Sequence, residues 1–187
     1  GINSLLPSDI SVSFIQKAPV DFHSRFDAIN RSYAYVIYNG KTQPIFLRDY
    51  IYWEKHEIDI EIMRAEAANL IGTHNFNSFR GSKCTAKNQV RTIKSIEIEQ
   101  KDGFIIISLC ANAYLYNMVR IIVGTLLEIS KGSKKNMKTI LNAQDRKIAG
   151  KTAQAQGLFF VGAEYKKINL DIKENITHPL SFLINPR

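Results

Sequence analysis

Alternation of apolar and polar side chains recurs along this chain, and a period of two predicts β-strands. The alternation is clearest at 92–99, whereas 33–38 is dominated by aromatic and β-branched residues that favour strands. A turn signal, Asn39-Gly40, ends one strand, and Lys-Asp-Gly at 101–103 predicts a hairpin. The strands predicted on this basis are 11–15, 33–38, 51–53, 92–99, 104–109 and 158–161.

Three other segments repeat their apolar residues at the spacing of a helix. The segments are 60–70, the stretch from 112 through 124, and a basic segment at 134–142. In the long central segment one apolar stripe is formed by Leu115, Met118, Val119, Ile122, Val123 and Leu126. Gly124 costs such a helix roughly 1 kcal/mol relative to alanine. We therefore expect another backbone to approach closely at that position.

The order of these elements is strands, helix, hairpin, long helix and strand, which predicts an α+β domain. We expect an antiparallel sheet with the helices packed on one face, leaving the other face or an edge for a ligand. Residues 1–166 read as one domain and 167–187 as a polar tail. Residues 73–89 are polar and irregular, which is typical of a functional loop.

Arg120 lies at the border of the apolar stripe of the central helix. Because arginine keeps its charge, a partly buried Arg120 needs an anion nearby. Periodicity alone leaves a second possibility open, in which the side chain extends along the surface into solvent. No motif within the chain obviously supplies the anion.

Charge points toward polyanionic partners. The 187 residues carry 25 Lys and Arg against 17 Asp and Glu, a formal net charge of +8, and the calculated pI is about 9.5. The basic residues gather in two groups, Arg80, Lys83, Lys87, Arg91 and Lys94, and then Lys131, Lys134, Lys135, Lys138, Arg146, Lys147 and Lys151. A merely solubilising surface is the competing interpretation.

Other classes of protein are disfavoured. No apolar run approaches the roughly 18 residues of a membrane span, and the first residues do not resemble a signal peptide. Two cysteines, Cys84 and Cys110, are typical of cytosolic thiols rather than a disulfide framework. The histidines show no metal-ligand spacing, so no metal site is expected. The start at Gly1 rather than at Met suggests an excised fragment or a processed chain.

Several motifs, taken together and in order, resemble those of the bacterial tRNA pseudouridine synthase A (TruA-type) family. They are 22–28 (Phe-His-Ser-Arg-Phe-Asp-Ala) with 31–35 (Arg-Ser-Tyr-Ala-Tyr), 72–79 (Gly-Thr-His-Asn-Phe-Asn-Ser-Phe) with 90–93 (Val-Arg-Thr-Ile), 118–124 (Met-Val-Arg-Ile-Ile-Val-Gly), and 145–153 (Asp-Arg-Lys-Ile-Ala-Gly-Lys-Thr-Ala) with Gly157-Leu158. Each motif is weak alone, but together they cover nearly the whole chain, from about residue 5 to 165.

The resemblance implies a fold and a chemistry. Family members convert uridines in the anticodon stem-loop of tRNA to pseudouridine, breaking the N-glycosidic bond and forming a C–C bond without a metal or organic cofactor. The implied fold is one half of a pair of RRM-like or ferredoxin-like α+β units, with RNA bound in a basic cleft between them. The implied enzyme is a cytoplasmic homodimer.

One departure from the family pattern is decisive for activity. The family's nucleophilic aspartate lies in a Gly-Arg-Thr-Asp-x-Gly-Val-His motif, which the 187 residues do not contain. The chain therefore resembles the C-terminal part of the enzyme, with the N-terminal half lying outside it, and we expect it to be inactive alone. The alternatives are a non-catalytic RNA-binding or dimerisation module and a domain that binds another anionic ligand.

The resemblance also implies roles for particular residues. Arg120 matches the arginine that pairs with the nucleophilic aspartate, and Tyr33 matches the tyrosine that stacks on the target base and takes part in proton transfer. Tyr35 and Tyr114 are expected in the core. The remaining candidates for substrate binding are Tyr116 and Asn117 near the pocket, and Arg80, Lys83, Lys87 and Arg91 as phosphate contacts.

Overall fold

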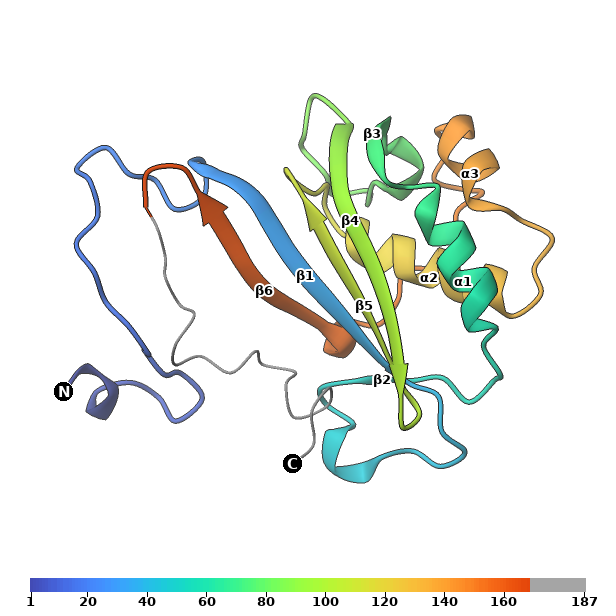
Figure 1. Cartoon of the computed structure of the whole chain (residues 1–187), viewed down its shortest axis with the longest axis horizontal. Helices are drawn as coiled ribbons and strands as arrows, with labels where there is room; N and C mark the ends of the chain where they lie inside the picture. The colour runs from blue at the N-terminus through green and yellow to red at the C-terminus, as the bar shows by residue number, and fades with distance from the viewer. Residues whose placement is uncertain (169–187) are drawn as a thin grey trace.

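The computed structural model describes residues 1–168, which form a mixed, mostly antiparallel six-stranded sheet with three helices on one side (Figure 1). The predicted α+β class is confirmed. The strands are β1 Ala28–Tyr38, β2 Tyr52–Trp53, β3 Gly72–Asn75, β4 Val90–Lys101, β5 Phe104–Ala111 and β6 Leu158–Tyr165. The helices are α1 Ile60–Ala68, α2 Met118–Ser130 and α3 Met137–Ala143, and short 3-10 turns occupy Ile2–Ser4, Ile45–Leu47, Asn77–Phe79 and Ala155–Gly157.

Strand β1 organises the sheet because it has neighbours along both of its edges. One edge pairs with β5, and the other pairs first with β6 and then, in parallel, with the short β2. The order across the sheet is β2-β1-β5-β4-β3, with β6 joined to β1. Tyr33 lies in the middle of this arrangement, opposite Leu109 on one side and Phe160 on the other.

Alternation along β1 divides its side chains between the two faces of the sheet. Tyr35 and Ile37 are fully buried in the main core against the helices, where Ile121 and Ile122 of α2 are also inaccessible to solvent. Ala34 and Val36 point the other way and join a smaller apolar cluster. The prediction that Tyr35 belongs to the core is confirmed, and its hydroxyl donates to the Gln154 carbonyl at 2.7 Å.

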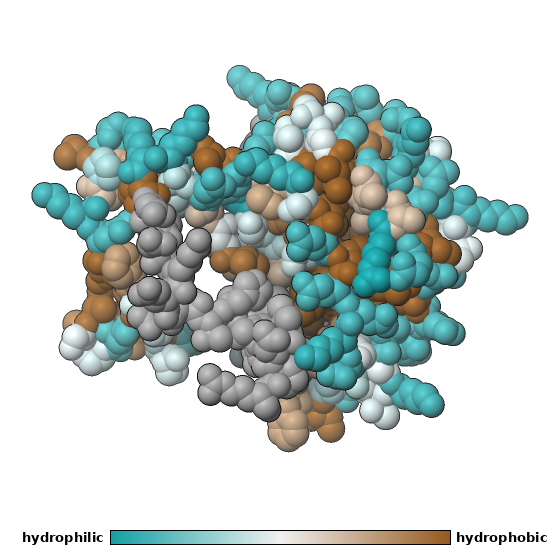
Figure 2. Space-filling model, viewed as in Figure 1, coloured by the Kyte–Doolittle hydropathy of each residue, from teal (hydrophilic) through white to brown (hydrophobic). Residues whose placement is uncertain are grey.

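The predicted strand at 11–15 is wrong. Residues 5–27 contain no strand and run outside the sheet as an irregular segment (blue in Figure 1). Figure 2 shows apolar surface on this outer segment, where exposed side chains include Leu5, Phe14, Ile15, Val20 and Phe26. A period of two is not sufficient for a strand, because backbone N–H and C=O groups also need a neighbouring strand with which to pair.

The central helix begins later than its apolar period indicates. Residues 112–117 are not helical, because Asn112 pairs with Thr92 through both its backbone N–H and its side-chain oxygen. Asn117 then takes a left-handed conformation with φ of 60°, and α2 starts at the next residue.

Other boundaries differ less. Strands β1 and β4 are longer than predicted, the expected 73–89 loop includes β3 and a 3-10 turn, and α3 begins three residues later than expected. The predicted polar tail, 167–187, lies almost entirely outside the described residues.

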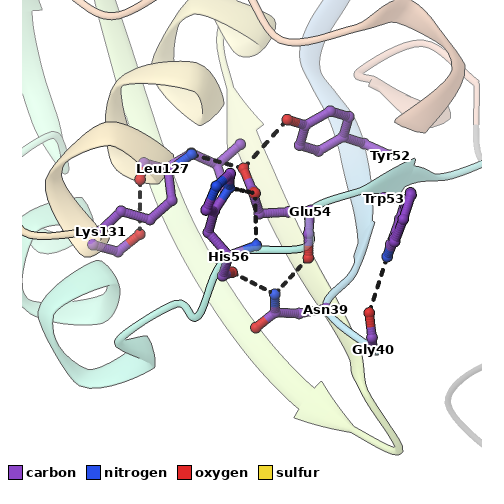
Figure 3. A network of polar contacts seen from close by, with 9 residues as sticks. Asn39, Gly40, Tyr52, Trp53, Glu54, His56, Leu127 and Lys131 are labelled. Carbon is purple, nitrogen blue, oxygen red and sulfur yellow. Dashed lines mark hydrogen bonds and ion pairs between the residues drawn. The ribbon is translucent and has the colours of Figure 1, made fainter. Parts of the chain in front are cut away.

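A buried carboxylate joins β2 to the C-terminal end of α2 (Figure 3). The Glu54 side chain is only 4% exposed and accepts a 2.7 Å bond from Lys131 Nζ. It also contacts His56 Nδ1 at 2.7 Å, and the backbone N–H of His56 donates to it at 3.0 Å. Although burial alone would raise it, these bonds lower the pKa of Glu54 to about 2. The cluster holds the short strand β2 against the helical layer.

Candidate functional site: an uncompensated cationic pocket

Arg120 occupies the first turn of α2 and is half-buried. Its Nε–H donates to the Ala153 carbonyl oxygen at 2.7 Å, and its Nη1 lies 3.4 Å from Asn117 Oδ1. Among residues 1–168, no carboxylate forms an ion pair with this guanidinium. Within the described part of the chain, the charge is therefore held in place by neutral oxygens and has no carboxylate partner.

A small pocket of about 110 Å³ lies beside Arg120. Tyr33 forms part of its wall and is half-buried, with its ring packed edge-on against Tyr114 at a centroid distance of 5.1 Å and against Phe160 at 5.3 Å. The pocket is lined by Tyr33, Tyr114, Leu115, Asn117, Met118, Val119, Arg120 and Leu158. Strand β1 and the start of α2 thus bring together an aromatic ring and a guanidinium that are far apart in sequence.

A larger pocket of about 670 Å³ adjoins the small one. The two share the residues Tyr33, Tyr114 and Leu115 in their walls. The charged residues around it are all basic, namely Arg25, Arg31, Lys83 and Arg91. No Asp or Glu lies among the described residues that line either pocket. The combined site therefore has a positive potential and aromatic walls, which is the chemistry that single-stranded nucleic acids require.

The arginines of the larger pocket are fixed by carbonyl groups. Arg31 donates to the backbone oxygens of Arg25, Ala28 and Asn112. Arg91 donates to the carbonyls of Asn88 and Val90, at 3.0 and 2.6 Å.

Burial lowers the pKa of the Arg91 guanidinium, and its Nε is buried without a hydrogen-bond partner in the described part of the chain. A guanidinium in this condition is stabilised by an incoming anion.

The candidate residues are only partly gathered by the fold. Arg120, Tyr33 and Asn117 line the small pocket, while Lys83, Arg91 and Tyr116 line the larger one. Arg80 and Lys87 line neither pocket. Arg80 instead donates to the Cys84 carbonyl at 2.8 Å, and Lys87 is exposed on the loop. Their placement is established, whereas the roles of all these residues stay predictions.

Sequence reasoning missed several residues of the site. Arg25 and Phe26 come from the segment before β1, and Arg31 from β1 itself, two residues before Tyr33. All three lie within motifs that carry the family resemblance, which was the available signal. Tyr114 packs against the core as expected, but it also lines both pockets, and its hydroxyl is buried without a partner among the described residues.

The second basic group in the sequence is used differently. Lys131 pairs with Glu54, and Lys135 lies 3.3 Å from Glu128. Arg146 donates toward the Ala149 carbonyl and the Thr152 hydroxyl. Two of its lysines are thus already neutralised, whereas the cations of the pockets form no ion pair with the residues that the structure describes.

Cys84 is set apart by its surroundings in the larger pocket. Burial alone would raise the pKa of its thiol. Hydrogen bonds from the backbone N–H groups of Tyr116 and Ala86, together with the Arg80 guanidinium, instead hold that pKa below its usual value.

Residues 1–168 contain no group of three or more His, Cys, Asp or Glu side chains that could hold a metal ion. Within the same range, no helix has both the length and the apolar character needed to cross a bilayer.

Comparison with known proteins identifies the family. A profile described as tRNA pseudouridine synthase matches residues 67–166. The tRNA pseudouridine synthase A of Francisella tularensis subsp. novicida (strain U112) is 40% identical over 171 residues, covering 90% of this chain and 66% of that protein. The protein of the same name from Hydrogenovibrio crunogenus is 40% identical over 167 residues, or 88% and 64% of the two chains.

An α+β chain with this pocket and these matches belongs to the tRNA pseudouridine synthase family. Within that family the chain is similar to tRNA pseudouridine synthase A proteins, and it spans about 66% of the length of the Francisella protein. Arg120 and most of the pocket-lining residues fall inside the segment that matches the family.

Proposed function

We propose that this chain is the part of a tRNA pseudouridine synthase A that carries the arginine of the catalytic ion pair. The nucleophilic aspartate would come from a segment outside the 187 residues, and the substrates would be uridines of the tRNA anticodon stem-loop. The observation that carries the proposal is Arg120, a half-buried guanidinium without a carboxylate partner in the described chain, beside an aromatic pocket.

An ion pair at Arg120 explains the chemistry expected of the aspartate. A guanidinium within about 4–6 Å lowers a carboxylate pKa by roughly 1–3 units. That shift corresponds to ~1.4–4 kcal/mol of preference for the ionised form, which is the form able to act as a nucleophile. Bidentate contact would also orient the carboxylate toward the ribose, and lysine cannot reproduce that geometry.

The aromatic wall is suited to a base removed from its stack. Neither C5 of uracil nor C1′ of ribose can be reached while the base is stacked in a stem, so the target nucleotide has to be flipped out. A stacking contact with Tyr33 would contribute ~1–3 kcal/mol. The cations of the larger pocket would then contact the phosphates on either side of the flipped nucleotide.

A two-part assay tests the proposal. The chain alone, and the chain joined after the part of the Francisella protein that lies outside the match, would be incubated with tRNA carrying tritium at C5 of uridine. Forming the new C–C bond displaces the hydrogen at C5, so isomerisation releases tritium. We expect release by the joined protein and none by the chain alone.

Controls separate the competing explanations. Arg120→Lys in the joined protein should lower turnover at least about tenfold, or ~1.4 kcal/mol of transition-state stabilisation. Release by the chain alone would contradict the proposal that the nucleophile lies outside it. Tight tRNA binding by a joined protein that releases no tritium, when the intact Francisella protein is active, would favour a non-catalytic RNA-binding module.

A further inference from the structure

Residues 150–153 form a strap that crosses α2 close to Arg120. The N–H of Gly150 donates to Thr125 Oγ1 at 2.9 Å, and the N–H of Lys151 donates to Glu128 Oε1 at 2.8 Å. At the other end, the Ala153 N–H donates to the Arg120 carbonyl at 3.0 Å. The Arg120 Nε–H returns a bond to the Ala153 carbonyl at 2.7 Å. The strap is therefore attached to α2 at both ends.

Gly124 is the residue that lets the strap lie this close to the helix. A Cβ at Gly124 would lie 1.8 Å from the Lys151 carbonyl oxygen and 3.2 Å from the Ala153 nitrogen. Both contacts are with backbone, so no flexible side chain can move to make room. The expectation that another backbone approaches Gly124 is confirmed. Glycine is less favourable than alanine in a helix, but its lack of a Cβ allows the strap to pack directly against α2.

We propose that Gly124 is a positioning residue for Arg120, acting through the strap and the Ala153 carbonyl. A neutral carbonyl takes the Nε–H and fixes the plane of the guanidinium without cancelling its charge. The two terminal nitrogens then remain for an anion, since the Nη1 contact to Asn117 is long at 3.4 Å. An incoming carboxylate would bind both terminal nitrogens together, end-on. The pairing of Arg120 with a carboxylate rests on the proposed function. The positioning of its guanidinium by Gly124 and the strap does not.

Nuclear magnetic resonance of the 187-residue chain tests the positioning without RNA or catalysis. The Arg120 Nε–Hε signal would be assigned by its loss in Arg120→Lys, and its exchange with water measured. In Gly124→Ala we expect the signal to shift and its exchange to accelerate by about tenfold, because the displaced strap no longer accepts the bond. Gly162→Ala is the matched control, since a Cβ there has no heavy atom within 4 Å.

A second pair of variants decides the matter should Gly124→Ala fail to fold. Glu128 is only half-buried and anchors the far end of the strap through Lys151, two turns along α2 from Arg120. Glu128→Ala should also accelerate exchange of the Arg120 signal, whereas Glu128→Gln keeps a carbonyl acceptor and should resemble the unmodified chain. Exchange unchanged within about twofold in Gly124→Ala would overturn the proposal, and where Gly124→Ala does not fold, the same result in Glu128→Ala would overturn it.

The resonance result and the tritium assay fail independently. An Arg120 signal that responds to Gly124→Ala, in a chain whose joined form releases no tritium, would leave the positioning intact and remove the proposed catalytic use. Tritium release by the joined protein, together with an Arg120 signal that does not respond to Gly124→Ala, would support the catalytic use of Arg120 and remove the proposed positioning by Gly124.

Discussion

Glu54 offers a quantitative test of how strand β2 is attached to α2, the helix whose first turn carries Arg120. Replacing it with glutamine keeps the shape of the side chain but removes the negative charge that Lys131 contacts at 2.7 Å. In the unmodified chain the His56 N–H donates to a Glu54 oxygen at 3.0 Å. The glutamine amide group would bring donor hydrogens toward this N–H, which is itself a donor. Glu54→Gln should therefore weaken the attachment of β2 to α2 while leaving the pocket residues untouched.

The magnitude follows from the pKa. Burial opposes ionisation of Glu54, yet the bond from Lys131 and the contacts with His56 lower the pKa from 4.5 to about 2. At ~1.4 kcal/mol per unit, the charged form contributes up to ~3 kcal/mol to folding. The Lys131 side chain is 29% exposed and can turn toward solvent in the variant, so we expect a loss of ~2–3 kcal/mol, near the low end for a broken buried pair.

Urea unfolding of the chain at a series of pH values measures this loss. Because the folded pKa is depressed, the stabilisation is fully present above about pH 4.5 and disappears as pH falls through that value toward 2. The stability difference between the unmodified chain and Glu54→Gln should narrow across that window. Glu57→Gln, at an exposed position three residues away, makes the same charge change and should cost under ~0.5 kcal/mol. Equal losses for the two variants at pH 7, or a gap independent of pH, would refute the reasoning.

Two further predictions concern the pocket. In the joined protein Tyr33→Phe should leave KM nearly unchanged and lower kcat at least about tenfold, because the ring still stacks but the hydroxyl is lost; an unchanged kcat would mean that only the ring matters. Arg91→Gln should reduce the slope of log affinity for tRNA against log salt by about 0.7–0.9. Lys94→Gln, exposed on β4 outside both pockets, should change that slope less, and an equal change would argue against a phosphate contact at Arg91.

The elements that could be predicted from sequence are those with strong local patterns and partners nearby in the chain. The β4–β5 hairpin is one, because alternation, the 101–103 turn and the pairing strand are contiguous. Gly124 is another, since an unfavourable residue in an apolar helix called for a specific contact, which the Lys151 carbonyl makes. The start of α2 was predicted wrongly because it depends on a distant partner. Asn112 pairs with Thr92, and this tertiary contact overrides the helical period of the sequence.

The site itself could be predicted only in part. The family motifs pointed to Arg120 and Tyr33, and the structure places both beside one small pocket. The phosphate contacts predicted from the same stretch are divided by the fold, since Arg91 lines the larger pocket and Lys87 lines neither pocket. Strand geometry and loop path decide between them, and neither is encoded within a few neighbouring residues.

The charge of the site depends on which acceptors hold its cations. In the scaffold, Lys131 is held by a carboxylate, and its charge is cancelled in the process. In the pockets, Arg31, Arg91 and Arg120 are held by backbone carbonyls, which provide direction without a compensating charge. A neutral acceptor orders the side chain before a ligand arrives and leaves its field available to that ligand. The contrast explains why net charge alone could not locate the site, since paired and unpaired cations contribute to it equally.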